Sequence, residues 1–247
     1  MNINYCQCKK IVKCLDNYFQ NNESLAAVEF PSTIIYKTDS YYLYMFYSCL
    51  LDYGMRSKIY HRNLVETYKN YPEIFNPYSV LNMNEDDLKN IIVSSIHPRY
   101  PNVAFKKWIE LSNTLKEYKS IKEALKKMNS FQELNSFIRS IKGYGQKTGG
   151  LLIRIIADSK ICNFEEEIDS IPIDRHDIEI SYCVNIIDSK TLTLSDIQNL
   201  SDAYVKVGKK LHINPSNIDK YLWEIGNSFC NKKDCKNCPV YSFCCRK

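Results

Sequence analysis

Two helical patterns joined by a Gly-X-Gly turn constrain this chain more than any other feature of its sequence. Residues 137–154 read FIRSIKGYGQKTGGLLIR, with Gly143 and Gly145 between the two patterns. Because glycine allows positive φ and close approach of another backbone, the turn can present bare N–H groups. With the start of the second helix, these groups form an anion site suited to a phosphate. A turn that only joins two core helices is the alternative, but Lys147 and Thr148, followed by an apolar run, favour the phosphate site.

Helical periodicity also dominates the rest of the chain. Only residues 28–36, interrupted by Pro31, hint at an extended segment. The sequence therefore predicts an all-α protein with short connections, in two lobes. Outside the hairpin, helical patterns cover residues 42–51, 59–71, 88–96, 103–115, 121–128, 174–187, 195–209 and 218–229.

Composition and charge exclude several classes of protein. Hydrophobic residues make up 45% of the 247 residues and charged residues 25%, which excludes an intrinsically disordered chain. The most apolar window, residues 41–55, contains Asp52 and is shorter than the ~20 residues that span a bilayer. The N-terminus lacks the pattern of a signal peptide, so we expect a soluble, cytoplasmic protein without membrane contacts. The net charge of +5 does not by itself indicate a nucleic-acid binder.

A hairpin of this kind grips a DNA backbone without reading its sequence. Because the net charge is small, basic residues must be concentrated on one face if the chain binds DNA. We expect a positive stripe from the hairpin to the C-terminal cysteines, with Lys142, Lys206, Lys209, Lys210 and Lys236 among its members. The residues expected to contact DNA are Gly143, Tyr144, Gly145, Gln146, Thr148, Lys232 and Lys233.

Lys147 and Asp174 are the candidates for chemistry. Lys147 falls in the first turn of a helix, where a positive charge opposes the helix dipole. Burial and the dipole would both favour a neutral, nucleophilic amine, whereas the alternative is a surface lysine that contacts a phosphate. Asp174 ends an extended segment and precedes an amphipathic helix, which is typical of an N-cap. Facing Lys147 across a cleft, its carboxylate would also accept a proton and stabilise positive charge on a sugar.

Four cysteines near the C-terminus are the strongest single signal. Cys230, Cys235, Cys238 and Cys244 have the spacing C-x4-C-x2-C-x5-C. Four thiolates can hold a [4Fe–4S] cluster or one tetrahedral zinc ion. Zinc sites tend to use two C-x2-C pairs and this segment has one, which favours the cluster. Cys245 is an alternative fourth ligand, and a disulfide is the other alternative, disfavoured where thiols are kept reduced.

Three motifs together resemble the endonuclease III branch of the helix-hairpin-helix DNA glycosylases. They are Gly143-Tyr-Gly-Gln-Lys-Thr148, Ile171-Pro-Ile-Asp-Arg-His176 and Leu222-Trp-Glu-Ile-Gly226, the last leading into the four cysteines. The resemblance covers residues 138–244 most specifically. It implies two helical lobes with a DNA-binding cleft between them. One is a six-helix barrel lobe of residues 40–157, with the hairpin near 134–157, and the other joins residues 1–39 and 158–247 around the cluster.

The resemblance also implies an activity. By motif position, Lys147 matches the nucleophile of this family and Asp174 its essential aspartate. The chain would then be a base-excision repair glycosylase with AP lyase activity, a monomer acting on double-stranded DNA that contains an oxidised base or an abasic site. Lys147 would form a Schiff base, and β-elimination would cut the strand. Two alternatives stay open: a monofunctional glycosylase in which Asp174 activates water, and a non-enzymatic iron–sulfur protein that binds DNA.

The sequence departs from the family pattern at three places. About 26 residues separate Lys147 from Asp174, more than is usual, so the acidic residues 165–167 are expected in an inserted loop. The first cysteine gap has four residues where six is common. Gly149 and Gly150 replace an Ala-Asn-like pair, and Arg175-His176 is closer to archaeal oxidised-guanine glycosylases. Base preference therefore does not carry over.

Three weaker candidates remain. Cys6, Cys8 and Cys14 form C-x-C-x5-C, which incidental or structural cysteines explain more simply than a second metal site. His97 lies in a loop where the family places residues near the flipped base, with a surface turn as the equal alternative. The tyrosines of residues 41–53 would either stack on an extrahelical base or form core.

Overall fold

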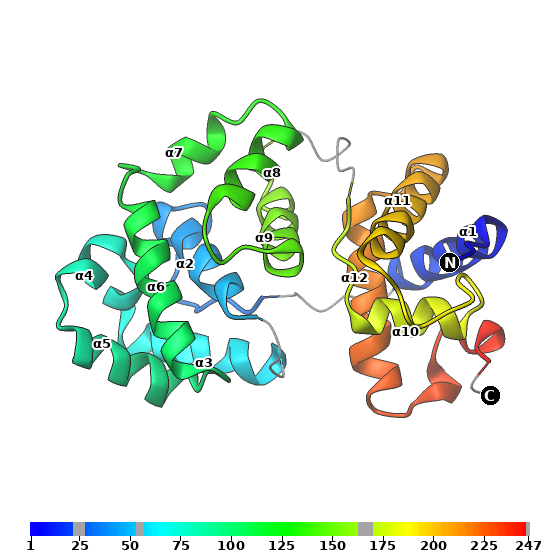
Figure 1. Ribbon diagram of the computed structural model, residues 1–247, viewed down its shortest axis with the longest axis horizontal. Coiled ribbons are helices and arrows are strands. Elements are labelled where there is room, and N and C mark those ends of the chain that lie inside the picture. Colours follow the sequence, from blue (N-terminus) through cyan, green and yellow to red (C-terminus); the bar gives the residue numbers. More distant parts are fainter. Residues whose placement is uncertain (22–27, 53–56, 163–169, 246–247) are drawn as a thin grey trace. The chain divides into compact units, whose positions relative to one another are not determined.

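The computed structural model describes residues 1–21, 28–52, 57–162 and 170–245 (Figure 1). Within these ranges every regular element is helical, and a single isolated β-bridge joins Ile3 to Ile187. This confirms the expected all-α fold. None of the helices described is long and apolar enough to cross a membrane.

The chain forms two compact units. Unit 1 comprises Met1–Ala26 and Glu166–Lys247, and unit 2 comprises Ala27–Glu165. Compared with the lobes expected from the motifs, residues 27–39 and 158–165 belong to the unit that contains the hairpin. The acidic residues 165–167, expected in an inserted loop, lie outside the described residues.

Helix α2 (Asp39–Leu50) forms the centre of unit 2. Every residue from Tyr42 to Leu50 is buried, as expected for a helix that is apolar on all sides. The helix packs against α9 and also contacts α6 and α7. Its tyrosines are therefore core residues and not a stacking wall for a base, although Tyr41 is only half-buried and Tyr53 lies outside the described residues.

Short helices with local caps surround α2. An asparagine or serine side chain accepts backbone N–H groups at the start of α4, α5, α7 and α8, which satisfies donors that the helix itself leaves without acceptors. Asn84 is the cap expected from the sequence. These elements of unit 2 are α3 (Ser57–Asn70), η1 (Pro72–Phe75), α4 (Pro77–Asn82), α5 (Glu85–Ile91), η2 (Ile92–Ile96), α6 (Pro101–Leu115), α7 (Ile121–Lys126), α8 (Phe131–Ser140) and α9 (Gln146–Asp158).

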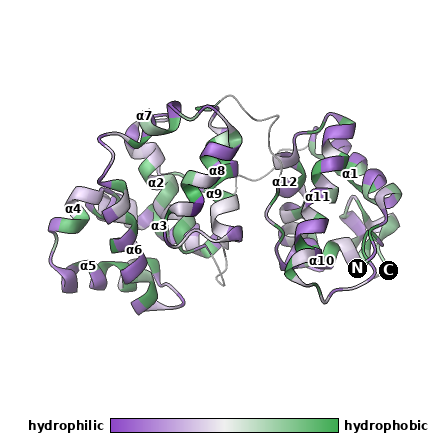
Figure 2. Cartoon of the chain, turned by 45° about the horizontal axis from the view of Figure 1, so that its top comes forward, coloured by the Kyte–Doolittle hydropathy of each residue, from purple (hydrophilic) through white to green (hydrophobic). Residues whose placement is uncertain are grey.

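Unit 1 joins the two ends of the chain in one hydrophobic core. The blue α1 (Tyr5–Phe19) lies beside the gold α11 (Leu194–Leu211) and also contacts α12 (Pro215–Glu224) (Figure 1). Its buried face includes Ile11 and Leu15, both without exposed surface. The helices carry hydrophilic as well as hydrophobic residues, as one-sided burial requires (Figure 2). The remaining elements are α10 (Arg175–Cys183), η4 (Ile225–Cys230), η5 (Cys235–Asn237) and η6 (Tyr241–Phe243).

The N-terminal cysteines serve this packing. Cys8 has no exposed surface, and burial raises the pKa of its thiol to about 12. Cys14 donates its S–H to the carbonyl oxygen of Pro239 at 3.4 Å, which ties α1 to the C-terminal segment. Cys6 is exposed. The structural interpretation of Cys8 and Cys14 accounts for their positions.

Candidate nucleic-acid interface

The turn between α8 and α9 has a backbone that requires glycine. Gly143 has φ = +108°, and a Cβ atom there would lie 3.0 Å from Cδ1 of Leu50. L-residues rarely adopt this conformation, and the side chain of Leu50 would crowd an added Cβ atom. The tight approach of the turn to α2 therefore depends on this residue.

Two side chains fix the turn from either end. Tyr144 is only 4% exposed, and its hydroxyl donates to the carbonyl oxygen of Phe46. The side chain of Tyr144 therefore anchors the turn. Of this residue, only the backbone is left for the expected contact with DNA. The hydroxyl of Thr148 accepts the N–H of Gly145 at 3.2 Å and donates to the carbonyl oxygen of Gly143 at 3.3 Å. This bracing holds the first turn of α9 at the protein surface.

The start of α9 combines a helix N-terminus with one basic side chain, that of Lys147. The first N–H groups of an α-helix have no acceptor within the helix and, with the helix dipole, they favour an anion. Gln146 and Lys147 are both exposed here. The burial expected to favour a neutral amine at Lys147 is therefore absent within the described structure.

A basic residue from a distant helix also reaches the turn. The side chain of Lys107, from α6, packs against Gly143, with its Cδ atom 3.8 Å from the position of an added Cβ. Lys142, next to Gly143, pairs its Nζ with Oε1 of Glu110 at 2.5 Å. Lys107 was not expected from the sequence, because no local signal relates it to a turn 36 residues away.

Asp174 caps α10, as expected. Its Oδ1 accepts the N–H groups of His176 at 2.6 Å and Asp177 at 3.2 Å. In return, Oδ2 of Asp177 accepts the N–H of Asp174 at 2.7 Å, which completes a capping box. Asp174 is half-buried. Asp174 belongs to unit 1 and Lys147 belongs to unit 2, so the surroundings of each residue are described only within its own unit.

Two of the three sequence motifs meet inside unit 1. A Cβ atom on Gly226 would lie 2.9 Å from Cβ of His176, so η4 approaches α10 closely because this residue is glycine. The cap of α10 and the segment that leads into the cysteines are therefore held together. His176 is half-buried at this contact.

The cysteine segment folds back on itself through its own backbone. The N–H of Lys233 donates to the carbonyl oxygen of Cys230 at 3.2 Å, and Lys233 has φ = +58°. Cys238 N–H donates to the carbonyl oxygen of Cys235 at 3.1 Å. These turns place Lys232 and Lys233 on the surface between the first two cysteines.

The four expected ligands lie within electrostatic reach of one another. Burial, with smaller contributions from negative charge on Cys230, Cys244 and Cys235, raises the pKa of Cys238 to about 11. Burial also raises the pKa of Cys230, again with contributions from Cys244 and Cys235. Among the described residues, however, no group of three or more His, Cys, Asp or Glu could hold a single metal ion.

Two metal centres use four cysteine ligands, a single zinc ion and a [4Fe–4S] cluster, and they differ in how far apart the sulfur atoms lie. Zinc needs four sulfur atoms about 2.3 Å from one ion. In a [4Fe–4S] cluster each cysteine binds its own iron, so the sulfurs lie farther apart. Both centres use four thiolates, so the donor set present here fits a [4Fe–4S] cluster or a zinc ion.

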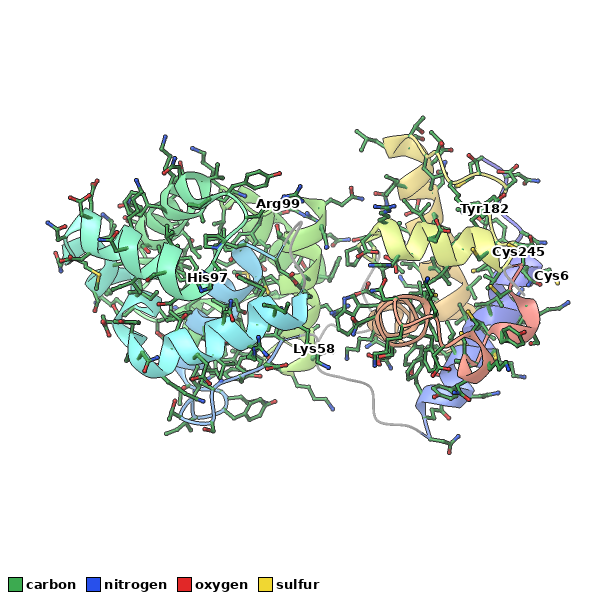
Figure 3. All side chains as sticks on the ribbon, turned by 90° about the horizontal axis from the view of Figure 1, so that it is seen from below. Cys6, Lys58, His97, Arg99, Tyr182 and Cys245 are labelled. Carbon is green, nitrogen blue, oxygen red and sulfur yellow. The ribbon has the colours of Figure 1, made fainter. Side chains whose placement is uncertain are left out.

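Cys245 is engaged elsewhere. Its N–H donates to the carbonyl oxygen of Cys183 at 2.7 Å, at the end of α10. Figure 3 shows Cys245 beside the end of α10 that carries Tyr182. Burial, with smaller contributions from the neighbouring thiols of Cys245 and Cys244, raises the pKa of Cys183 to about 12. Cys244 as the fourth ligand stays a prediction.

A second loop of unit 2 exposes candidate contacts. His97, at the end of η2, has φ = +55°. Pro98 is buried, whereas His97, Arg99 and Tyr100 are exposed. Figure 3 labels His97 and Arg99. The guanidinium group of Arg99 lies over the ring of Tyr100, 5.3 Å from its centroid. A DNA contact by this loop stays a prediction.

Comparisons with known proteins identify the fold. The sequence matches no protein-family model and no curated protein. A non-covalent complex of endonuclease III with DNA matches with a TM-score of 0.67 and 11% identity, covering 99% of this chain and 96% of that chain. The 8-oxoguanine glycosylase/lyase of Methanocaldococcus jannaschii, in complex with DNA containing 8-oxoguanine, matches with a TM-score of 0.55 and 18% identity, covering 88% of this chain and 89% of that chain.

A third match has a different substrate. The 3-methyladenine DNA glycosylase MagIII of H. pylori, bound to 1,N6-ethenoadenine, matches with a TM-score of 0.58 and 13% identity, covering 90% of this chain and 97% of that chain. At these identities the matches establish a shared fold. The chain therefore has the helical fold of the helix-hairpin-helix DNA glycosylases, as the motifs implied.

Proposed function

We propose that this protein is a DNA glycosylase of base-excision repair that removes an oxidised base and then cuts the strand as an AP lyase. The observation that carries the proposal is the α8–α9 hairpin. Its turn is held by Gly143, Tyr144 and Thr148, and it presents a helix N-terminus with Lys147 in the first turn. The matching solved structures, which are DNA glycosylases, support the same conclusion.

The proposed reaction begins with the DNA backbone bound at the hairpin. A damaged nucleotide leaves the base stack, which costs about a few kcal/mol and less for a mismatched or damaged base. The ammonium group of Lys147 gives a proton to water, and the resulting amine attacks C1′ and loses a second proton, while the bond from C1′ to the base breaks and the base departs with its electron pair. Asp174 stabilises the positive charge on the sugar and accepts the proton. The C1′–O4′ bond then breaks, O4′ takes up the proton from Asp174, and the opened sugar is left as a Schiff base. Loss of a proton from C2′ to water breaks the C3′–O3′ bond and expels the 3′ phosphate.

We further propose that Cys230, Cys235, Cys238 and Cys244 hold a [4Fe–4S] cluster. The mutual influence of these four thiols supports it. When bound, the cluster would organise the segment structurally and take no part in base release. The exposed Lys232, Lys233 and Lys236 would then face phosphates.

One observation favours a second candidate function. Lys147 is exposed, and an exposed lysine suits a phosphate contact as well as a nucleophile. The protein would then be a monofunctional glycosylase in which Asp174 activates a water molecule. MagIII shows that a glycosylase for alkylated adenine has the same fold.

Borohydride trapping separates the two candidates. We expect wild-type protein to form a covalent adduct with duplexes that contain 8-oxoguanine or an abasic site. Lys147→Gln should lose the adduct and still bind duplex, whereas Lys127→Gln, at an exposed lysine outside the expected positive stripe, should keep both. Strand cleavage that appears only after added alkali would favour the monofunctional enzyme. Failure to release any base from a panel of lesions, with no adduct on abasic DNA, would contradict both.

A further inference from the structure

The guanidinium group of Arg139 bridges the two helices of the hairpin. Arg139 lies in the last turn of α8 and is half-buried. Its Nη1 donates to the carbonyl oxygen of Gly145, the N-cap residue of α9. Its Nε donates to Oδ1 of Asn135, one turn earlier on α8, at 3.4 Å. One side chain thus connects the body of α8 to the first residue of α9.

Gly149 leaves the space that this guanidinium group occupies. A Cβ atom on Gly149 would lie 3.1 Å from Nη1 and 3.4 Å from Cζ of Arg139. Gly149 is buried inside α9, and its N–H donates to the carbonyl oxygen of Gly145 at 2.9 Å. Glycine inside a helix is unfavourable relative to alanine, so its use here needs a reason. The contact with Arg139 supplies it.

The geometry of α9 transmits this contact to Lys147. Gly145 and Gly149 are four residues apart and share one face of the helix. Lys147 stands halfway between them in sequence, about 200° around the axis, and therefore lies on the opposite face. The guanidinium group of Arg139 holds the face with Gly145 and Gly149 against α8. This contact sets the rotation of the first turn of α9, and therefore the direction in which Lys147 and the terminal N–H groups point.

We propose that Arg139 is a positioning residue for the hairpin, acting through its fork-shaped guanidinium group and the gap at Gly149. For the rate of base release the proposal rests on the proposed function above. For duplex binding and stability it stands independently, because the terminal N–H groups bind phosphate whether or not chemistry follows.

A double-mutant cycle tests the contact itself. In the wild-type background, the added methyl group of Gly149→Ala lies 3.1 Å from Nη1 of Arg139, so the guanidinium group must shift by a few tenths of an ångström and we expect a lower melting temperature. In the Arg139→Ala background the same substitution meets no guanidinium group and gains helix propensity, so we expect the melting temperature to rise by about 2–4 °C. The sign of the effect should therefore reverse. An equal change in melting temperature in both backgrounds would show that Arg139 and Gly149 are not coupled, which would contradict the proposal.

The variant Arg139→Lys tests whether the shape of the guanidinium group or only its positive charge is needed. Lysine keeps the positive charge but lacks the planar fork that reaches both Asn135 and Gly145. We expect Arg139→Lys to behave like Arg139→Ala, with duplex affinity reduced and single-turnover base release at saturating DNA slowed ~10- to 100-fold. Wild-type affinity and rate in Arg139→Lys would overturn the positioning role.

Failure of the proposed function would look different. If wild-type protein released no base from any lesion, the glycosylase assignment would fall. Duplex affinity and the melting cycle would still decide the role of Arg139, since neither measurement depends on catalysis.

Discussion

At the scale of single residues, the hairpin depends on side chains that contact its backbone. Leu50 closes the space beside Gly143, and Thr148 links the carbonyl of Gly143 to the N–H of Gly145. Each of these contacts involves a particular position of the turn, so small substitutions should have effects that differ between neighbouring residues.

Gly143→Ala should be destabilising, whereas Gly145→Ala should be tolerated. Alanine at residue 143 would be strained at φ = +108° and would crowd Leu50, for a loss of about 1–3 kcal/mol in the free energy of unfolding. Gly145 has φ = −82°, and an added Cβ meets nothing within 4 Å. Urea unfolding of both variants measures the difference. Equal losses would show that the positive φ of Gly143 carries no strain.

Variants of Asp174 should distinguish its role as the N-cap of α10 from the role of its negative charge in base release. Asp174→Ala removes the cap of α10 and should cost about 1 kcal/mol of stability. Asp174→Asn keeps a good N-cap side chain but removes the carboxylate, so stability should hold while base release falls by ~10²-fold or more. Thermal unfolding and single-turnover base release are measured on both. Wild-type rates in Asp174→Asn would exclude the carboxylate from the reaction.

At the scale of elements, the turns between η4 and η6 present lysines from a segment held by its own backbone bonds. Lys232 and Lys233 are exposed between Cys230 and Cys235, and Asn237 donates to Oδ1 of Asp234 at 2.8 Å. Such a loop suits phosphate contacts, which carry no base specificity.

Replacing Lys232 and Lys233 together with glutamine should weaken binding to damaged and undamaged duplex alike. The slope of log K against log salt should flatten by about one for each phosphate that the loop no longer neutralises. Lys126 and Lys127, on and just after α7, give a matched pair outside the expected stripe and should leave the slope unchanged. A changed lesion preference with an unchanged slope would show that the cysteine loop reads the base instead.

At the scale of the whole molecule, the chain has two separately packed units. Unit 1 draws its core from α1, α10, α11 and α12, and unit 2 is built around α2. Each unit therefore has a stability of its own, and a change confined to one core should leave the other largely intact.

Loss of iron should loosen unit 1 alone. We expect purified protein to be yellow-brown with about four irons per chain. Cys244→Ser should lose colour and hydrogen-exchange protection in residues 225–245, while α2 and α9 keep theirs; Cys245→Ser should retain the colour. A colourless protein with one zinc per chain would contradict the cluster assignment. Loss of colour in Cys245→Ser but not in Cys244→Ser would identify Cys245 as the fourth ligand.

Much of the fold is readable in the sequence because its signals are local. Helical periodicity, the glycines of the turn and the extended residues before Asp174 each act within a few residues, and the structure has the helices, the hairpin and the cap that they predict. The buried run of α2 also follows from its composition, although apolar periodicity did not distinguish a core helix from a stacking wall.

Other features were decided only by the tertiary structure. The pairing of Arg139 with Gly149, of His176 with Gly226, and of Cys245 with Cys183 joins residues whose separation in the chain carries no signal. Helix α1, in a region that no motif covers, completes the core of unit 1. The physical reason is the same in each case: local preferences determine which helices form, whereas the side chains that meet depend on how distant helices pack to bury their apolar faces.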